Sequence, residues 1–328
     1  MMRAARLWSV LLPLAVAVAC GGGSSDSAEG DSGVPAFLSF GTAPPGGAFF
    51  VVGGALTEVL NAQTSETWSV TAEATSGSQE NIRRLTTGEL DFALSNAAIT
   101  YFAVRGTEGW DRAYPVRAVM TLAPNVALFL TKSNSGVRTI ADLKGQRVVI
   151  GPAGAGFEYF VQPLLAAHGV TYADFTPLNA TQSAAVDMLA DNSAAASFIG
   201  GAIPTASITQ ASASMDVFFV PFDDQAVEKL VADYIFFDRA TIPADTYRGQ
   251  TTAFEGLDVG SMHLITSADQ DEDVVYRVTK ALYESREQVT QRHAAGAAIN
   301  AGNVVRNTGT EFHPGAIRYY REIGIWPQ

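Results

Sequence analysis

The stretch from Val148 to Phe160 reads VVIGPAGAGFEYF: a short apolar run, a glycine-rich turn and the beginning of a helical pattern. A short apolar run of this kind is typical of a buried strand. The turn places backbone N–H groups at the start of a helix, where they can hold a phosphate or a carboxylate. The stretch therefore predicts a strand–turn–helix unit of an α/β fold with an anion-binding turn.

Strand-like and helix-like patterns alternate along the rest of the chain. Strands are predicted at 36–40, 68–75, 91–95, 116–123, 127–132, 146–151, 173–178, 196–201, 217–222, 234–238 and 261–268. Helices are predicted at 48–63, 76–85, 140–145, 157–169, 181–192 and 271–289. Ser76 with Gln79, and Ser267 with Gln270, have the spacing of capping pairs at two helix starts. This alternation predicts α/β layers with largely parallel sheets.

Glycine- or serine-rich turns follow several of the predicted strands. They lie at 41–50, 74–81, 151–158 and 198–205. Ligands of open α/β sheets bind beyond the carboxyl ends of the strands, where helix N-termini point into a crevice. The chain is long enough for two lobes with separate cores. We therefore expect two α/β lobes, joined by strands that cross between them, with the turns meeting at one ligand cleft.

The first nineteen residues have the order of an export signal. Arg3 and Arg6 give a positive start, residues 7–18 are almost entirely apolar, and small residues precede Cys20. This apolar stretch is too short for a membrane-spanning helix and is typical of a signal peptide. The segment AVAC resembles a bacterial lipobox, in which the cysteine carries the lipid, although Ala17 departs from the usual larger aliphatic residue.

We therefore expect a lipoprotein signal peptide at 1–19, lipidation of Cys20, and a flexible tether over 20–36, which is small and polar. The alternative is an ordinary secreted protein with an incidental cysteine. Cys20 is the only cysteine, so the folded part has no disulfide, no thiolate nucleophile and no cysteine metal site. No later segment is long and apolar enough to cross a bilayer.

Charge and motifs exclude several functional classes. The net charge is −12, and it becomes −14, from 19 basic and 33 acidic residues, once residues 1–19 with their two arginines are removed. An acidic chain argues against nucleic-acid binding, which needs a concentrated basic surface. The glycine turn has a tyrosine, Tyr159, where a dinucleotide fingerprint needs a third small residue, and no Lys-Ser/Thr pair follows it, which disfavours nucleotide binding.

Hydrolase and metal motifs are also missing from the sequence. There is no G-x-S-x-G or H-E-x-x-H motif, and the four histidines are scattered. The acidic run at 269–275 lacks the glycine and the distal glutamate of a calcium loop, and acids are common at a helix N-terminus. Arg318 and Tyr319, near the C-terminus, are expected to anchor the last helix. We therefore expect no catalytic residue, no metal site and no cofactor.

Several segments carry motifs of one family in order. They read FGTAPPGGAFFVVGGAL (40–56), SGSQENIRRLTTGELDFAL (76–94), IADLKGQRVVIGPAGAGFE (140–158), FIGGAIPTASI (198–208), TIPADTY (241–247) and HPGAIRYYREIGIW (313–326). In these segments the chain resembles the TAXI family, whose members are extracytoplasmic solute receptors of TRAP transporters. The resemblance covers essentially all of residues 37–328.

The resemblance implies a two-lobe periplasmic-binding-protein type II fold with a hinge and a cleft between the lobes. Lobe 1 would comprise 37–125 and 264–328, and lobe 2 would comprise 126–263. It also implies an exported receptor, on the periplasmic or cell-surface side, that closes on one small solute and passes it to a TRAP membrane permease. The alternatives are a ligand-sensing lipoprotein of a signalling system and, less favoured by the motifs, an exported enzyme.

The resemblance also indicates which residues face the ligand. In lobe 1 these are Phe49 and Phe50 at the family's Y-Y positions, Ser76 and Ser78 in the second turn, and Asn96, with Asn81 as support for the loop. In lobe 2 they are Ala155, Gly156 and Phe157, followed by Gly201 and Pro204 on the fourth turn.

Departures from the family pattern share one direction. Both tyrosines are phenylalanines here, the serine and threonine of the G-S-G-T turn are Ala155 and Phe157, and Ala98 stands where an aspartate is frequent. Each change removes a hydrogen-bonding side chain, and a buried ligand group left without a partner would cost about 1–3 kcal/mol. The sequence therefore favours a solute less polar than glutamate, the ligand type associated with the family: a carboxylate with an aromatic or aliphatic body.

Overall fold

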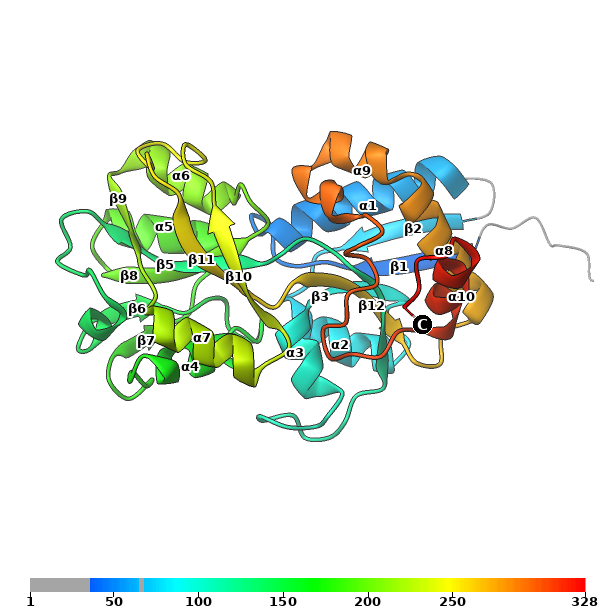
Figure 1. Ribbon diagram of the computed structural model, residues 1–328, viewed down its shortest axis with the longest axis horizontal. Helices are drawn as coiled ribbons and strands as arrows, with labels where there is room; N and C mark the ends of the chain where they lie inside the picture. The colour runs from blue at the N-terminus through cyan, green and yellow to red at the C-terminus, as the bar shows by residue number, and fades with distance from the viewer. Residues whose placement is uncertain (1–35, 65–67, 328) are drawn as a thin grey trace, which may run out of the picture. The chain divides into compact units, whose positions relative to one another are not determined.

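The computed structural model describes residues 36–64 and 68–327. The expected signal peptide, Cys20 and nearly all of the tether lie outside the described residues. The described part of the chain contains two β-sheets, each accompanied by helices, and Figure 1 shows them on opposite sides of the view with strands passing between them. The predicted α/β fold class with two lobes is confirmed.

The first sheet has the strand order β2–β1–β3–β12–β4. Its strands are β1 (Ala36–Gly41), β2 (Trp68–Glu73), β3 (Phe92–Asn96), β4 (Val116–Thr121) and β12 (Met262–Ser267). Its helices are α1 (Ala48–Thr64), α2 (Ser78–Thr86), α3 (Ala97–Ala103), α8 (Glu272–Glu284), α9 (Arg286–Arg292), the 3-10 helix η2 (Ala294–Ala298) and α10 (Pro314–Glu322). β1 runs parallel to β2 and β3, whereas β12 runs antiparallel to β3 and β4.

The second sheet has the order β10–β11–β5–β8–β6–β7, and β9 also pairs with β5. Its strands are β5 (Val126–Lys132), β6 (Arg147–Val149), β7 (Thr176–Leu178), β8 (Ala196–Gly201), β9 (Val217–Val220), β10 (Phe237–Ile242) and β11 (Phe254–Val259). Its helices are the 3-10 helix η1 (Ile140–Leu143), α4 (Glu158–Ala167), α5 (Gln182–Ala190), α6 (Ala206–Ser214) and α7 (Asp224–Asp233).

The chain passes between the sheets twice, at residues 122–125 and at residues 260–261, just after β11. The residues on either side of the second passage bond to the first: the N–H of Met262 donates to the carbonyl of Ala123 over 2.9 Å, and the N–H of Val259 donates to the carbonyl of Asn125 over 3.1 Å. We call residues 122–125 and 258–261 the crossing segments. They are the covalent links between the halves.

Apolar packing also joins the two halves beside the crossing segments. One core cluster extends from residues of α3 and the first sheet to residues of α4 and the second sheet. At its centre the ring of Tyr159, from α4, stacks on Phe102 and Trp110, with centroids 5.9 and 5.8 Å apart. The amide of Gln79 in α2 donates to the Tyr159 hydroxyl over 3.0 Å. The α3–α4 side is therefore a packed contact between the lobes.

The expectation of largely parallel sheets is wrong. Parallel pairing occurs within the β2–β1–β3 and β7–β6–β8 groups, but β12, β5, β9, β10 and β11 all pair antiparallel. The reason is topological. A strand that crosses from one lobe enters the other sheet from the opposite end, so β5 and β12 run against their neighbours.

Two predicted helix starts and one helix length are also wrong. Neither Ser76 nor Ser267 caps a helix: α2 begins at Ser78 after Gly77, and Asp271 caps α8 by accepting from the N–H of Val274. The helix predicted over 271–289 is two helices that meet at Ser285. The strand predicted at 234–238 begins only at Phe237, as β10.

Candidate ligand-binding site

One pocket lies between the two lobes, at the carboxyl ends of strands from both sheets. It is lined by Thr42, Ala43, Pro44, Pro45, Gly47, Ala48, Phe49, Ser76, Gly77, Ser78, Asn96, Ile99, Asn125, Pro152, Ala155, Phe157, Phe160, Thr181, Gln182 and Gly200. A cavity volume of about 60 Å³ remains for the centres of water-sized molecules. Since one water needs about 10–15 Å³ on this measure, the pocket suits only a small solute.

Helix N-termini supply the electrostatic character of this pocket. Lining residues stand at the starts of four helices, α1 and α2 from the first lobe and α4 and α5 from the second. The first N–H groups of a helix have no intrahelical partner, and the N-terminal end of the helix dipole is positive. None of the twenty lining residues is charged. The pocket can therefore receive one anionic group, and it offers no carboxylate to a cation.

The polar groups predicted in the first lobe are largely occupied by the protein itself. The Ser78 hydroxyl accepts a hydrogen bond from the N–H of Asn96 over 3.0 Å. Asn96 caps α3: its Oδ1 accepts from the N–H of Ala98 over 2.8 Å, and its Nδ2 donates to the carbonyl of Gly260 over 2.7 Å. Both side chains line the pocket and connect its wall to a crossing segment. Ser76 lines the pocket and is exposed.

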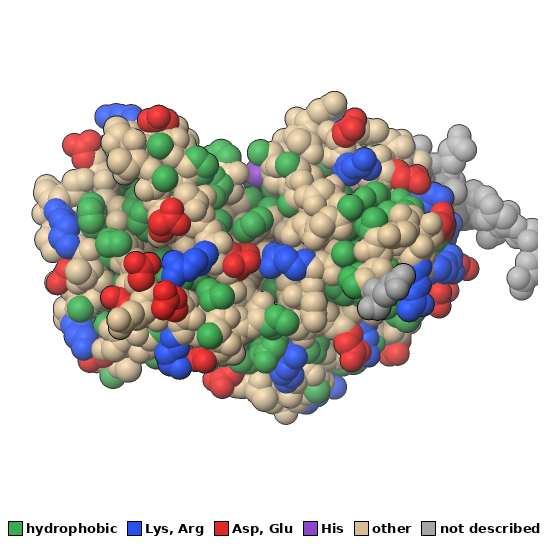
Figure 2. Space-filling view, in the orientation of Figure 1, with side chains coloured by type: hydrophobic (Ala, Val, Ile, Leu, Met, Phe, Trp, Pro, Cys, Tyr) green, Lys and Arg blue, Asp and Glu red, His purple; other side chains and the backbone are tan. Residues whose placement is uncertain are grey.

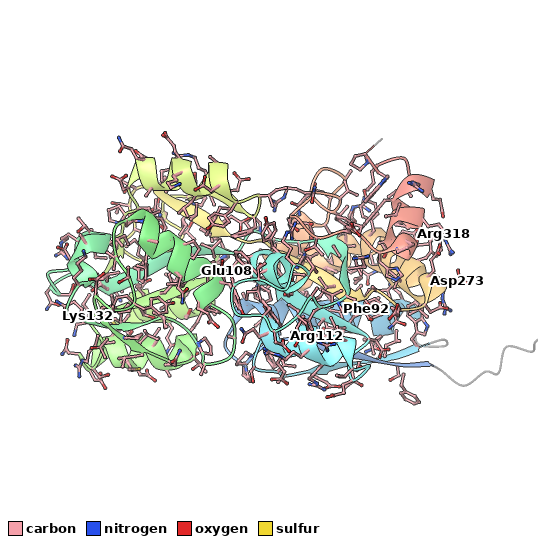
Figure 3. All side chains as sticks on the ribbon, turned by 90° about the horizontal axis from the view of Figure 1, so that it is seen from below. Phe92, Glu108, Arg112, Lys132, Asp273 and Arg318 are labelled. Atoms are coloured by element: carbon pink, nitrogen blue, oxygen red, sulfur yellow. The ribbon has the colours of Figure 1, made fainter. Side chains whose placement is uncertain are left out.

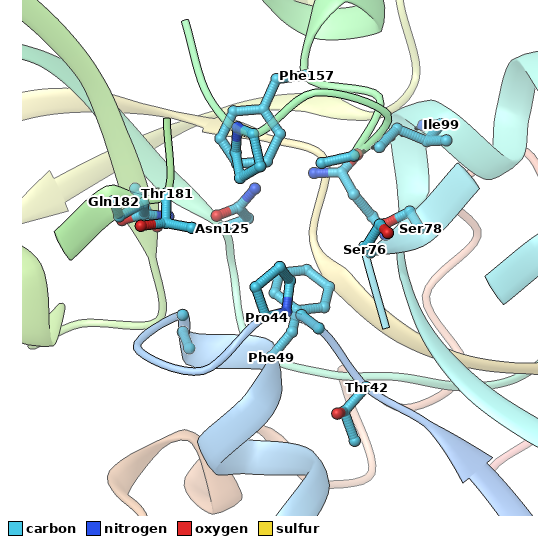
Figure 4. A pocket seen from close by; sticks show the side chains of 18 of the residues that line it. Thr42, Pro44, Phe49, Ser76, Ser78, Ile99, Asn125, Phe157, Thr181 and Gln182 are labelled. Carbon is cyan, nitrogen blue, oxygen red and sulfur yellow. Dashed lines mark hydrogen bonds between the residues drawn. The ribbon is translucent and has the colours of Figure 1, made fainter. Parts of the chain in front are cut away.

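Aromatic side chains form two opposing walls. Figure 4 shows Phe157 on one side of the pocket and Phe49 with Pro44 on the other. Phe157 lies over Gly151, where a Cβ atom would be 2.3 Å from the ring and where the backbone φ is +115°. Glycine at 151 therefore lets the ring lie flat against the turn. These side chains give the pocket two facing apolar surfaces.

Two residues that sequence reasoning missed stand at the start of α5. The Thr181 hydroxyl caps the helix by accepting from the N–H of Ala184. The Gln182 amide donates to the carbonyl of Gly200 over 2.8 Å, and its Oε1 accepts from the Ser207 hydroxyl over 2.8 Å. These contacts fix the α5 N-terminus against β8. The sequence does carry a signal for them, because a threonine followed by a glutamine stands at the start of a predicted helix.

Asn125 was also missed. It lies on a crossing segment, only 6% of its surface is exposed, and its side chain lines the pocket. Its backbone is held from both sides, since its N–H donates to Asp258 Oδ1 over 3.0 Å and its carbonyl accepts from the N–H of Val259. Its carboxamide has no hydrogen-bond partner among the described residues.

Five of the predicted site residues do not line the pocket. Phe50 points outward with 37% of its surface exposed. Asn81 is fully buried, and its amide donates to the carbonyls of Thr42 and Leu94, each over 2.8 Å. Asn81 thus ties the β1–α1 loop to β3.

The other three, Gly156, Gly201 and Pro204, belong to the second lobe and are also absent from the pocket lining. A Cβ atom on Gly156 would lie 2.9 Å from Ile99 Cδ1, so this glycine permits a close contact with α3. Gly201 makes a similar approach to Ala48. Pro204 follows a cis peptide bond after Ile203. Ala155, by contrast, lines the pocket, and a Cβ atom on Gly77 would lie 3.4 Å from its Cβ.

A buried charged cluster lies beside the pocket, around the crossing segments. Asp258 Oδ2 accepts from the Ser261 hydroxyl over 2.5 Å and lies 3.7 Å from the Arg306 guanidinium. Burial raises the pKa of Asp258 to about 6 even though these partners favour its charged form. Burial, reinforced by Arg306, lowers the pKa of His263 to about 3. His263 Nε2 shares a hydrogen bond of 2.8 Å with the Thr100 hydroxyl.

The other histidines and the C-terminal motif have structural partners. His293 and His313 accept from backbone N–H groups at the starts of η2 and α10. Arg318 pairs with Asp273 over 2.7 Å and lies on the ring of Tyr276, and Figure 3 shows Arg318 and Asp273 together at one end of the first lobe. Within 36–64 and 68–327, no group of three histidines, cysteines or acids could hold a metal ion.

The surface carries mixed charge. On the face seen in Figure 2, lysine and arginine side chains are interspersed with acids, and the surface is indented between the two halves. In the part of the chain that the structure describes, no helix has the length and apolar character needed to cross a membrane.

Several solved structures share this fold. PhnD1 from Prochlorococcus marinus, in complex with methylphosphonate, is 11% identical with a TM-score of 0.56, over 88% of this chain and 96% of that one. A structure described as a periplasmic transporter is 12% identical with a TM-score of 0.54, and the match covers 88% of this chain and 92% of that one. XAC2383 from Xanthomonas citri bound to ATP is 9% identical with a TM-score of 0.50, and the match covers 88% of this chain and 95% of that one. The sequence profile of the NMT1-like family matches residues 40–324, and the chain therefore belongs to the NMT1-like family.

Proposed function

We propose that this protein is an extracytoplasmic solute-binding receptor that captures a small carboxylate by closure of its two lobes. The observation that carries the proposal is the pocket itself. Helix N-termini from both lobes meet there, so an anion bound between them contacts both halves at once. A ligand that contacts both lobes stabilises the closed state by its differential affinity for that state. The family and the fold support a binding protein rather than an enzyme.

The chemistry of the lining favours a carboxylate with an uncharged, apolar body. Phe49, Phe157 and Pro44 form apolar walls, and no acidic side chain among the lining residues could pair with an ammonium group. A buried ammonium without a partner is strongly unfavourable. The small cavity also argues against a solute as large as a nucleotide. PhnD1 holds methylphosphonate, so phosphonates belong among the ligands to be compared.

The wider context of the proposal follows the resemblance to TAXI receptors. The receptor would pass its solute to a TRAP-type permease, and a lipid on Cys20 would hold it at the membrane on the outer side of the cell or in the periplasm. Lobe 1 would comprise 37–125 and 264–328, and lobe 2 would comprise 126–263. The ligand would be held by Phe49, Ser76, Ser78, Asn96, Ala155 and Phe157.

Native mass spectrometry of the protein purified from its own host tests the proposal directly, because a closed receptor can retain its solute. A thermal-shift panel of butyrate, benzoate, phenylacetate, glutamate and methylphosphonate then ranks the ligand classes. We expect stabilisation by the monocarboxylates that exceeds that by glutamate. Stabilisation by glutamate alone would refute the carboxylate class proposed here, and turnover of any ligand would refute the receptor.

A further inference from the structure

Asn125 presents the one side-chain amide of the pocket lining that has no partner among the described residues. The amides of the other lining Asn and Gln residues are both bonded within the protein, Asn96 to Gly260 and Gln182 to Gly200. Only 6% of the surface of Asn125 is exposed, yet its carboxamide makes no hydrogen bond with the described residues. The amide atoms are not sealed inside the protein but open onto the pocket, so a ligand that enters the pocket can supply the missing hydrogen-bond partner.

The position of Asn125 is fixed by its backbone. Its N–H bonds to Asp258 Oδ1 and its carbonyl to the N–H of Val259, both on the other crossing segment. The following residue, Val126, pairs with Gly201 in the second sheet. The carboxamide is thus carried by a backbone that is held on both sides, and a supported backbone reduces the cost of ordering this group when a ligand binds.

The start of α5 lies on the same side of the pocket. Gln182 donates to the carbonyl of Gly200, and Gly200 pairs with Ala127, two residues after Asn125. Figure 4 shows Asn125 near Thr181 and Gln182, and across the pocket from Ser76 and Ser78. An anion bound at the N-terminus of α5 is therefore within the neighbourhood of the free amide. The amide and the helix start together form a polar end to an otherwise apolar pocket.

We infer that Asn125 is a specificity-determining residue whose Nδ2 donates a hydrogen bond to the carboxylate of the solute, beside the backbone N–H of Gln182. This inference rests on the proposed function. It selects monocarboxylates over amino acids: the carboxylate occupies the polar end, and the remaining lining has aromatic and aliphatic side chains but no acid to receive an ammonium group.

The test uses purified full-length protein, with benzoate and butyrate as probes in calorimetric titrations. Asn125→Ala removes the donor, and Asn125→Asp keeps the shape but places a negative charge beside the carboxylate. Asn134→Asp is the matched control, because Asn134 is exposed on a turn of the second lobe. We expect the affinity to fall about tenfold or more in Asn125→Ala and at least about a hundredfold in Asn125→Asp, since a hydrogen bond to a charged group is worth about 1.5–3 kcal/mol. Asn134→Asp is expected to bind as the wild type does.

The outcomes separate the inference from the proposed function. Wild-type binding of benzoate or butyrate with unchanged affinity in both Asn125 variants would overturn the inference and leave the receptor standing. If the wild type bound neither these nor the other carboxylates of the panel, the inference about Asn125 and the proposed carboxylate receptor would both be refuted. Should Asn125→Ala unfold, as circular dichroism would reveal, the isosteric Asn125→Asp alone decides: an unchanged affinity refutes the inference and a large loss supports it.

Discussion

Gly201 and Ala48 approach each other so closely that no methyl group fits between them. A Cβ atom on Gly201 would lie 2.8 Å from the Cβ of Ala48, although Gly201 has no strained backbone angle that would itself require glycine. Gly201 ends β8 in the second lobe, and Ala48 begins α1 in the first. The contact therefore joins the two lobes at the rim of the pocket, and glycine at 201 permits this degree of closure.

Gly201→Ala should weaken ligand binding by holding the lobes apart. Overpacking typically costs about 1–3 kcal/mol, which corresponds to roughly a tenfold to hundredfold loss of affinity if it acts only on the closed state. Gly54→Ala is the control, because a Cβ atom on Gly54 of α1 meets nothing within 4 Å. Calorimetric titration with benzoate measures both variants. Equal affinities for Gly201→Ala and wild type would show that the contact does not limit closure.

The two-lobe α/β fold was predictable because local patterns and topology agree over most of the chain. The crossing segments were harder to see. β11 was not predicted, since Glu255, Gly256 and Asp258 interrupt its apolar pattern. The structure explains Asp258 by two hydrogen bonds: its carboxylate accepts from the N–H of Asn125 on the other crossing segment and from the hydroxyl of Ser261 on its own. A buried acid that is specified by a distant partner leaves no periodic signal in the sequence.

The pocket was predictable only where a turn directly follows a strand. Ala155 and Phe157 lie on such a turn, and both line the pocket. Asn125 has no such signature, because the segment around it reads as an ordinary connection between strands. Gly201 lies on a predicted turn but contacts the opposite lobe. Sequence spacing locates a turn, and tertiary packing decides whether its residue meets the ligand or the other lobe.

Phe49 and Phe50 are adjacent and chemically identical, which makes them a matched pair. Phe49 lines the pocket, whereas Phe50 points outward. Phe49→Ala should lower the affinity for benzoate about tenfold, since an aromatic pair contributes about 0.5–1.5 kcal/mol beyond the area it buries. Phe50→Ala should leave the affinity unchanged. A comparable loss in both variants would place the ligand elsewhere than between Phe49 and Phe157.

Asn81 holds the β1–α1 loop beside the pocket, and we expect Asn81→Ala and Asn81→Asp to lower the free energy of unfolding by different amounts. Asn81→Ala leaves the carbonyls of Thr42 and Leu94 without their donor, at about 1–3 kcal/mol for each unsatisfied group. Asn81→Asp should destabilise the protein more, because an ionised carboxylate faces the same two carbonyls and cannot donate to either. Urea unfolding at pH 7 measures the free energies. A variant Asn81→Asp as stable as Asn81→Ala would contradict the assigned hydrogen bonds.

Stability should depend on pH through His263 and Asp258, with opposite signs. The pKa of His263 falls from 6.5 to about 3 on folding, so the unfolded chain binds a proton there that the folded chain does not. The free energy of unfolding therefore decreases as pH drops from 6.5 towards 3, by up to about 5 kcal/mol. The pKa of Asp258 rises from 3.8 to about 6, so the folded chain takes up a proton first. Protonation of Asp258 therefore raises the free energy of unfolding by up to about 3 kcal/mol as pH drops from 6 to 3.8.

Urea unfolding between pH 7 and pH 4 separates the two contributions. His263→Gln removes the buried imidazole and should flatten or reverse the acid loss over this range. Asp258→Asn removes the compensating carboxyl group and should make the acid loss steeper than in the wild type. Both changes are read as differences from the wild-type curve, so titration of the exposed acids cancels. If His263→Gln lost stability on acidification as steeply as the wild type, the buried imidazole would not be the group that makes the fold sensitive to acid.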